Sequence, residues 1–265
     1  MPLTIIQYLI LGIIQGITEW IPISSSGITT LVMSNFYDIT SISEILHAAL
    51  FLHLGTFFAA LVYLRKDVWN LIKSLFNYKK SEGEIKLILN FLIISTIITA
   101  AIGLALLQLI NLSSLEITGK AISFAVGFFL LITGIFQIKI KNKGLRKESN
   151  LKKNDGVVLG LLQGLSTIPG LSRSGITVSG LLIKKFDDVS ALRLSFLMSL
   201  PVVLLGNILL NWRDFVITNT ALYGVLAAFV LGLLTISAMM KLAKKINFGW
   251  FVLIFAVLMM LAVLV

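Results

Sequence analysis

Long apolar runs, interrupted at two places by Gly, Ser and Pro, give this chain its pattern. Six runs are long enough to cross a membrane as helices: 46–64, 87–110, 117–138, 189–210, 221–240 and 246–265. At 1.5 Å per residue, about 20 helical residues span the ~30 Å hydrocarbon layer. The pattern therefore predicts an all-α, polytopic integral membrane protein with six transmembrane helices.

Two further apolar stretches do not fit a simple span. The stretch 3–14 is too short to cross before it meets Gln15, Glu19 and Pro22, and the stretch 156–183 is interrupted by Pro and Gly. Irregular backbone at membrane depth is tolerated only where it is buried in protein or lines a wet cavity. Each stretch therefore predicts a re-entrant helical hairpin, which enters the membrane and turns back.

The two re-entrant stretches repeat each other. QGITEWIPISSSGIT, which starts at Gln15, and QGLSTIPGLSRSGIT, which starts at Gln163, agree at seven of fifteen positions at a constant offset of 148. Three spans follow each hairpin, and this odd number inserts the second half upside down relative to the first. We expect one membrane domain of two inverted-topology repeats, 1–138 and 155–265, joined by a basic cytoplasmic loop, 139–154.

Composition and charge agree with a membrane protein. The chain is 57% hydrophobic and 13% charged, with a mean hydropathy of +0.99, whereas soluble domains carry about 25% charged residues. Nineteen of its 22 Lys and Arg residues lie in four loops, 65–86, 139–154, 184–193 and 241–245, which the predicted topology places on one side.

The positive-inside rule makes that basic side cytoplasmic and puts both termini outside. The net charge of +10 is then a topology signal, and we expect no nucleic-acid partner. We expect a multi-pass protein of the cell membrane with no cleaved signal peptide, because the N-terminus lacks a basic region and a small-residue cleavage site. With no cysteine, disulfides, thiol chemistry and Cys-type zinc sites are excluded.

Two charged residues lie deep in apolar sequence, and each belongs to a different copy of the repeat. They are Glu19 and Arg173, and each would cost about 2.5–3.5 kcal/mol at the bilayer centre. We expect them to line one cavity. They could form a structural ion pair between the hairpins. Alternatively, Arg173 could hold phosphate oxygens bidentately, with hydroxyl and backbone N–H groups as further donors.

Further candidate ligands surround this pair in the sequence. Gln15 lies one helical turn before Glu19, and the Gly/Ser clusters supply Ser24, Ser25, Ser26, Gly27, Gly170, Ser172, Ser174 and Gly175. Some of these serines are expected to be helix caps instead. His53 is a candidate catalytic residue, although a lone histidine in a span is more often an interhelical hydrogen bonder. Mg²⁺ or Ca²⁺ could enter with a diphosphate that supplies most ligands itself, with Glu19 as a candidate protein ligand.

Four motifs, in order along nearly the whole chain, resemble those of the undecaprenyl-diphosphate phosphatase (bacitracin-resistance) family. They are QGITEWIPISSSG, HLGTFFAALVYLRKD, IPGLSRSG and LSFLMSLPVVLLG. The resemblance implies six spans with two re-entrant hairpins, and removal of the terminal phosphate from a C55 isoprenyl diphosphate. It assigns Gln15 and Glu19 to the first acidic motif and Arg173 to the arginine motif. That family usually has a catalytic histidine after the first motif's glycine, where this chain has Ile28.

We therefore expect a membrane phosphatase that hydrolyses a polyprenyl diphosphate and recycles the lipid carrier of cell-envelope synthesis. In this reading Arg173 binds phosphate, Ser25 is a hydrogen-bond donor or the nucleophile, and Glu19 activates Ser25 or water, or binds a cation. A flippase or transporter of a phosphorylated lipid or small anion is the alternative, because inverted repeats are also transporter architecture. The bilayer and the lipid are the expected partners, and a homodimer is a further candidate assembly.

Overall fold

The computed structural model describes residues 3–21, 23–39, 41–112, 144–168, 171–211 and 219–242, together with isolated positions near 128–135 and at 253 and 257. Within these ranges the structure is helical apart from turns, loops and one isolated bridge between Arg146 and Phe186. The predicted all-α class is confirmed for this part of the chain.

Four of the described helices are long and apolar enough to cross a membrane. They are α3 (Ile42–Tyr63), α5 (Gly83–Leu112), α9 (Asp188–Gly206) with the π-helix η3 (Asn207–Asn211), and α10 (Asn219–Leu242). These helices confirm the runs predicted at 46–64, 87–110, 189–210 and 221–240. The other two predicted spans, 117–138 and 246–265, fall almost entirely outside the described residues.

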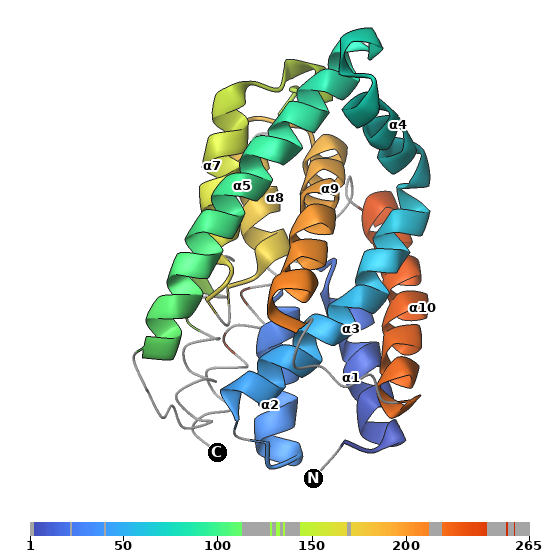
Figure 1. Cartoon of the computed structure of the whole chain (residues 1–265), viewed down its shortest axis with the longest axis vertical. Coiled ribbons are helices and arrows are strands. Elements are labelled where there is room, and N and C mark those ends of the chain that lie inside the picture. The colour runs from blue at the N-terminus through green and yellow to red at the C-terminus, as the bar shows by residue number, and fades with distance from the viewer. Residues whose placement is uncertain are drawn as a thin grey trace.

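Two hairpins of short helices correspond to the repeated stretches. The first contains α1 (Ile5–Thr18) and α2 (Ser25–Phe36), and the second contains α7 (Lys153–Leu165) and α8 (Arg173–Ile183). In Figure 1, α1 and α2 occupy the lower part of the bundle and α7 and α8 the upper part, so the two hairpins approach from opposite ends. Their turns meet in the middle, where Ser174 Oγ donates to the Ile21 carbonyl at 3.0 Å.

Three of the four hairpin helices, α1, α2 and α8, start where a side chain replaces a missing backbone partner. The first N–H groups of a helix have no acceptor within it, so a preceding polar side chain stabilises the start. Before α1, Gln7 N–H donates to Thr4 Oγ1 at 3.3 Å while Thr4 N–H donates to Gln7 Oε1 at 2.8 Å. Ser24 and Ser172 cap α2 and α8 in the same way.

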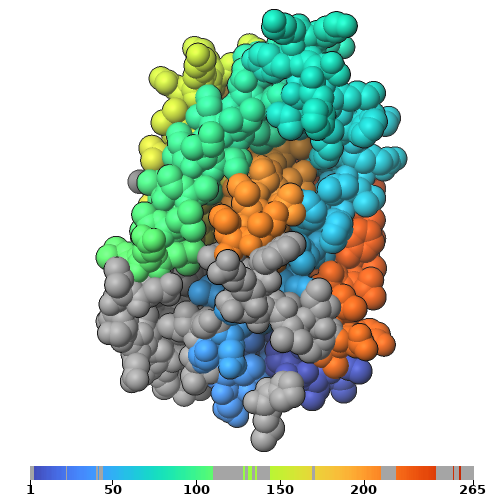
Figure 2. All heavy atoms as spheres, viewed as in Figure 1, coloured from blue at the N-terminus to red at the C-terminus, as the bar shows by residue number. Residues whose placement is uncertain are grey.

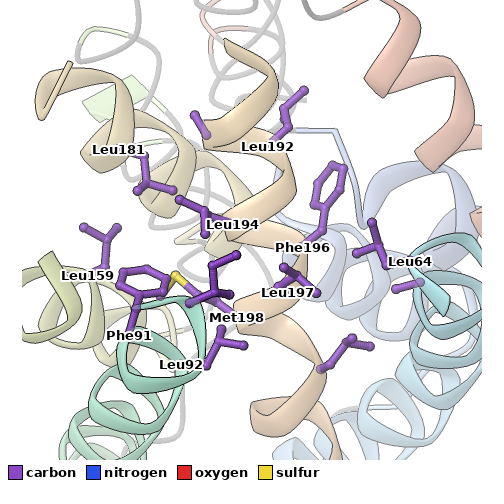
Figure 3. Close-up of a cluster of buried hydrophobic side chains, with 14 of the residues drawn as sticks. Leu64, Phe91, Leu92, Leu159, Leu181, Leu192, Leu194, Phe196, Leu197 and Met198 are labelled. Carbon is purple, nitrogen blue, oxygen red and sulfur yellow. The ribbon is translucent and has the colours of Figure 1, made fainter. Parts of the chain in front are cut away.

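The helix α9 is the centre of the bundle and contacts α3, α5 and α8. Figure 3 shows Met198 of α9 directed towards Phe91 of α5 and Leu159 of α7, whereas Phe196 and Leu197 lie on the opposite side of the helix. These five residues are at most 2% exposed.

Large apolar side chains are exposed on the outer helices as well, for example Ile97 of α5 and Leu234 of α10. Helix α9 is visible between α5 and α3 (Figure 2). Apolar side chains both inside and outside are what a bundle surrounded by lipid requires.

Close backbone contacts fix the hairpin helices against two of the long helices. A Cβ on Gly12 of α1 would lie 2.1 Å from the Gly224 oxygen of α10, and one on Gly160 of α7 would lie 2.9 Å from the Ser95 oxygen of α5. Gly12 and Gly160 are 148 residues apart, the offset of the repeat. Each hairpin therefore packs one helix on a long helix from the other half of the chain.

The loops at the basic end are more ordered than the sequence predicts. Residues 65–86, expected as a loop, contain the amphipathic helix α4 (Arg65–Phe76) and the short 3₁₀ helix η1 (Tyr78–Lys80). The described part of the connecting loop contains the 3₁₀ helix η2 (Glu148–Asn150) and buries Glu148 and Leu151. Ion pairs accompany this order: Arg193 contacts Asp67 at 2.6 Å and Glu148 at 2.9 Å.

Candidate active site

The turns of the two hairpins have the same capping geometry. Ser24 Oγ accepts from Gly27 N–H at 3.1 Å and lies 3.3 Å from Ser26 Oγ. In the other hairpin Ser172 Oγ accepts from Gly175 N–H at 3.1 Å and lies 3.3 Å from Ser174 Oγ. Ser24 and Ser172 therefore act as helix caps, as the sequence allowed. The first-turn N–H groups of both helices point towards the meeting point of the hairpins, an arrangement that favours an anion.

Glu19 lies at this meeting point and is 5% exposed. Its Oε2 accepts hydrogen bonds from Ser25 Oγ at 2.7 Å and from Gln15 Nε2 at 2.9 Å, and it lies 3.2 Å from His53 Nε2. Its Oε1 accepts from Arg173 Nη2. One buried carboxylate thus contacts side chains from α1, α2, α3 and α8. Glu19 and Arg173 are in direct contact, as both the shared site and the structural ion pair require.

Arg173 is held between the second hairpin and α9. Its Nη1 donates to the Ser195 carbonyl at 3.3 Å, and its guanidinium lies 5.8 Å from the Trp20 ring centre, within the range of a cation–π contact. Thr177 Oγ1 and Ser195 Oγ lie 2.6 Å apart and join α8 to α9 behind it. The Arg173 side chain is 16% exposed, and its contacts with Ser195 and Glu19 use two of the five N–H groups of its guanidinium, so others remain for an incoming anion.

The remaining candidates divide into two groups. Ser25, Gln15 and His53 contact Glu19 directly, whereas Ser26, Ser174, Gly27 and Gly175 belong to the capped turns beside it. Gly170 lies outside the described residues. Sequence reasoning missed Ser195 and Thr177, which look like ordinary polar residues in an apolar helix. Only the contact between α8 and α9 shows that they support Arg173.

A cation site built by the protein does not fit this arrangement. Both oxygens of Glu19 are already engaged, one with Arg173 and the other with three neighbours. Nowhere in the described ranges do three His, Cys, Asp or Glu side chains gather as a metal-binding group. The geometry therefore gives no support to Glu19 as a metal ligand.

Comparison with known proteins identifies the family of this site. The family described as "Bacitracin resistance protein BacA" matches residues 8–261. The chain belongs to this family. It is 41% identical to an undecaprenyl-diphosphatase of Methanococcoides burtonii, with 94% of each chain covered. It is also 36% identical to one of Thermosipho africanus, over 95% of this chain and 98% of the relative, and 34% identical to one of Haloarcula marismortui, over 92% of each.

Ile28 occupies the position at which the motif resemblance leads one to expect a histidine. Its backbone N–H donates to the Ser24 carbonyl at 3.0 Å, as that of Ile176 donates to the Ser172 carbonyl at 2.9 Å in the other hairpin. Both side chains are partly buried. The residue thus has the same place in both copies of the repeat, and it brings no ionisable group to the first turn of α2.

Proposed function

We propose that this chain is an undecaprenyl-diphosphatase, a membrane hydrolase that converts a polyprenyl diphosphate into the monophosphate and inorganic phosphate. The observation that carries this proposal is the buried chain of contacts from Ser25 through Glu19 to Arg173. It combines a hydroxyl, a base and a fixed cation inside an apolar bundle, which are the groups that phosphoryl transfer needs. The family membership and the names of its relatives support the same activity.

Each of the three residues has a role that follows from its contacts. Arg173 binds the phosphate oxygens through its partly exposed guanidinium and stabilises the charge that develops on them. Glu19 Oε2 accepts the proton of the attacking hydroxyl, which belongs either to Ser25 or to a water that Ser25 orients. The first-turn N–H groups of α2 and α8 supply further donors, and the apolar surface keeps the isoprenoid chain in the lipid.

We also propose that the chain spans the membrane six times, in two inverted-topology repeats, with the basic loops in the cytoplasm. The opposite directions of the two hairpins and the placement of basic loops at the α4 end of the bundle support this topology. The chain has no native cysteine, so single cysteines introduced at Ser149 and Asn219 can be labelled cleanly. An impermeant maleimide added outside intact cells should label Asn219→Cys and spare Ser149→Cys, whereas the reverse result would refute this orientation.

The activity is tested by phosphate release from undecaprenyl diphosphate by the purified protein, with and without Mg²⁺ or Ca²⁺. We expect release of one phosphate per lipid and accumulation of the monophosphate. Reconstitution into liposomes provides the competing outcome. Transfer of the intact diphosphate between leaflets, without release of phosphate, would overturn the enzymatic function and favour a flippase.

A further inference from the structure

We propose that His53 is a positioning residue for this reaction, which shares a proton with Glu19 and so holds the carboxylate in place beside Ser25. The role in the reaction rests on the proposed function. The sharing of a proton between the two side chains does not, because it follows from the geometry of the buried cluster alone.

The orientation of the His53 ring is fixed by its own helix. Its Nδ1 lies 2.6 Å from the Ala49 carbonyl oxygen, one turn earlier in α3. A carbonyl can only accept a hydrogen bond, so Nδ1 carries a hydrogen. The other nitrogen, Nε2, therefore faces Glu19 either with a lone pair or with the second hydrogen of a charged imidazolium.

The distance between His53 and Glu19 decides what lies between them. Nε2 and Glu19 Oε2 are 3.2 Å apart, and the carboxylate is buried. A nitrogen lone pair and a carboxylate oxygen facing each other at this distance, away from water, repel each other. A proton between the two atoms turns this repulsion into a charge-assisted hydrogen bond, so the pair holds one proton.

His53 is the neighbour of Glu19 that can exchange this proton. Gln15 and Arg173 also contact the carboxylate, but an amide does not ionise and a guanidinium stays protonated in proteins. Ser25 donates to the same oxygen, Oε2, that His53 faces. The arrangement is that of an activated nucleophile, in which a hydroxyl contacts a base and a third group orients the base.

The other charged groups around His53 do not compete for this role. Glu19 faces it from α1 and Arg173 from α8. Helix α2 contains no charged residue, and the charge of α10 within its bounds is Lys241 in its last turn. On α9, Asp188 lies in the first turn and Arg193 is paired with Asp67 and Glu148. Glu19 and His53 are therefore the exchanging pair.

The Glu19–His53 pair holds the same number of protons before and after the reaction. The attacking hydroxyl forms a bond to the terminal phosphorus and gives its proton to Glu19 Oε2. The P–O bond to the lipid monophosphate breaks and its electron pair stays on the leaving oxygen, which takes up the proton that Glu19 received. When the attacking hydroxyl belongs to water, the product is inorganic phosphate. When it belongs to Ser25, a water then attacks the phosphorus of the phosphoserine and gives a proton to Glu19, the Ser25–phosphorus bond breaks, and that proton returns to Ser25 Oγ. Throughout these steps the hydrogen bond from His53 Nε2 keeps Oε2 directed at the hydroxyl.

The kinetic test compares His53→Gln and His53→Ala with His47→Gln, which changes the chain's other histidine on the same helix. General base catalysis is worth about 10²–10⁴-fold, and a base that is no longer positioned loses part of it. We therefore expect kcat/KM for phosphate release to fall about 100-fold in His53→Ala, in which Glu19 loses its positioning residue. His53→Gln keeps a hydrogen-bond donor but cannot ionise, so it should recover part of the rate. In the wild type, loss of the shared proton should lower kcat/KM at alkaline pH, and this fall should be absent in His53→Gln. His47→Gln should keep both rate and profile. The role would be overturned if His53→Ala kept the wild-type kcat/KM and its pH dependence. It would also be overturned if His53→Gln restored both.

A second measurement needs no activity. With ¹⁵N-labelled histidine, the Nε2 resonance of His53 should shift when Glu19→Gln is introduced at constant pH, while that of His47 should not. An unchanged His53 resonance would exclude the shared proton. If instead the wild-type protein released no phosphate but this shift were observed, the proposed function would fail and the Glu19–His53 pair would stand.

Discussion

The turns of the two hairpins have the same serine caps and different chemistry. In both, a serine caps the second helix, and its hydroxyl lies 3.3 Å from the hydroxyl of a serine two residues later. The first hairpin, however, has Glu19 and Ser25 where the second has Thr167 and Arg173. Two identical turns would bring like charges together at the centre of the bundle. A single exchange in each turn instead produces one anion, one cation and one asymmetric site.

Removing the anion should have the largest effect. Glu19→Gln keeps the shape of the side chain but cannot take the proton of the attacking hydroxyl, so kcat for phosphate release should fall by about 10³-fold or more. The matched control is Thr167→Val, at the equivalent position of the second hairpin, which should stay within about threefold of wild type. Both are measured on protein that elutes as folded material from gel filtration. Comparable losses in the two variants would show that the hairpins do not differ in this way.

Replacing the guanidinium of Arg173 by an amine should have the next largest effect on activity. Arg173→Lys keeps the charge but loses the planar pair of donors that can hold a phosphate and contact Ser195 together. We expect kcat/KM to fall about 100-fold, as for the loss of one transition-state donor. Retention of more than about half of the wild-type kcat/KM would identify Arg173 as a structural partner of Glu19.

Much of this asymmetric pair could be predicted from the sequence, because its signal is local. A repeat at a constant offset shows which positions are equivalent, and a charge inside an apolar stretch stands out against it. Glu19, Ser25 and Arg173 were found in this way. His53 was only a weak candidate, because the rotation of α3 about its axis decides whether its ring faces the site or the lipid. No local pattern determines that rotation.

Prediction of the fold from local sequence patterns has the same limit. Hydrophobic length predicted the four long helices that the structure describes, since crossing a membrane is a requirement on each helix separately. The packed basic loops were not predicted, because their order depends on partners far away in the chain. Arg193 of α9 pairs with Asp67 of α4 at 2.6 Å and with Glu148 at 2.9 Å. Each of these residues looks, in its own segment, like an ordinary solvated charge.

The two hairpins also differ in how tightly they pack, and this should appear in stability. A Cβ at Gly12 would meet the carbonyl oxygen of Gly224 at 2.1 Å, whereas one at Gly160 would have its nearest contacts at 2.9 Å. Overpacking costs about 1–3 kcal/mol when neighbours must shift. Gly12→Ala should therefore lower the thermal unfolding midpoint in detergent more than Gly160→Ala does. Equal shifts, or a larger shift for Gly160→Ala, would contradict the difference in packing.

The smallest expected effect is on the pH dependence of stability. It concerns the starts of the two hairpins, where one of two equivalent residues can ionise and the other cannot. Gln7 and Asp155, 148 residues apart, both accept a backbone N–H three residues earlier, at 2.8 Å from Thr4 and 2.9 Å from Lys152. Burial alone would raise the pKa of Asp155. Hydrogen bonds from Arg146, the Lys152 N–H and Lys184 outweigh it, so its pKa lies below the ordinary value of 3.8.

A carboxyl group whose pKa is lower in the folded protein stabilises the fold above its unfolded pKa, and this contribution is lost as the pH falls through the folded pKa. The second hairpin should therefore loosen in acid below about pH 4, while the amide of Gln7 leaves the first hairpin unaffected. Asp155→Asn should lower the unfolding midpoint at neutral pH and make it less dependent on pH in this acid range. Gln7→Ala, the matched control, should weaken the cap of α1 without changing the pH dependence. If Asp155→Asn and wild type lose stability in parallel on acidification, the titrating group lies elsewhere.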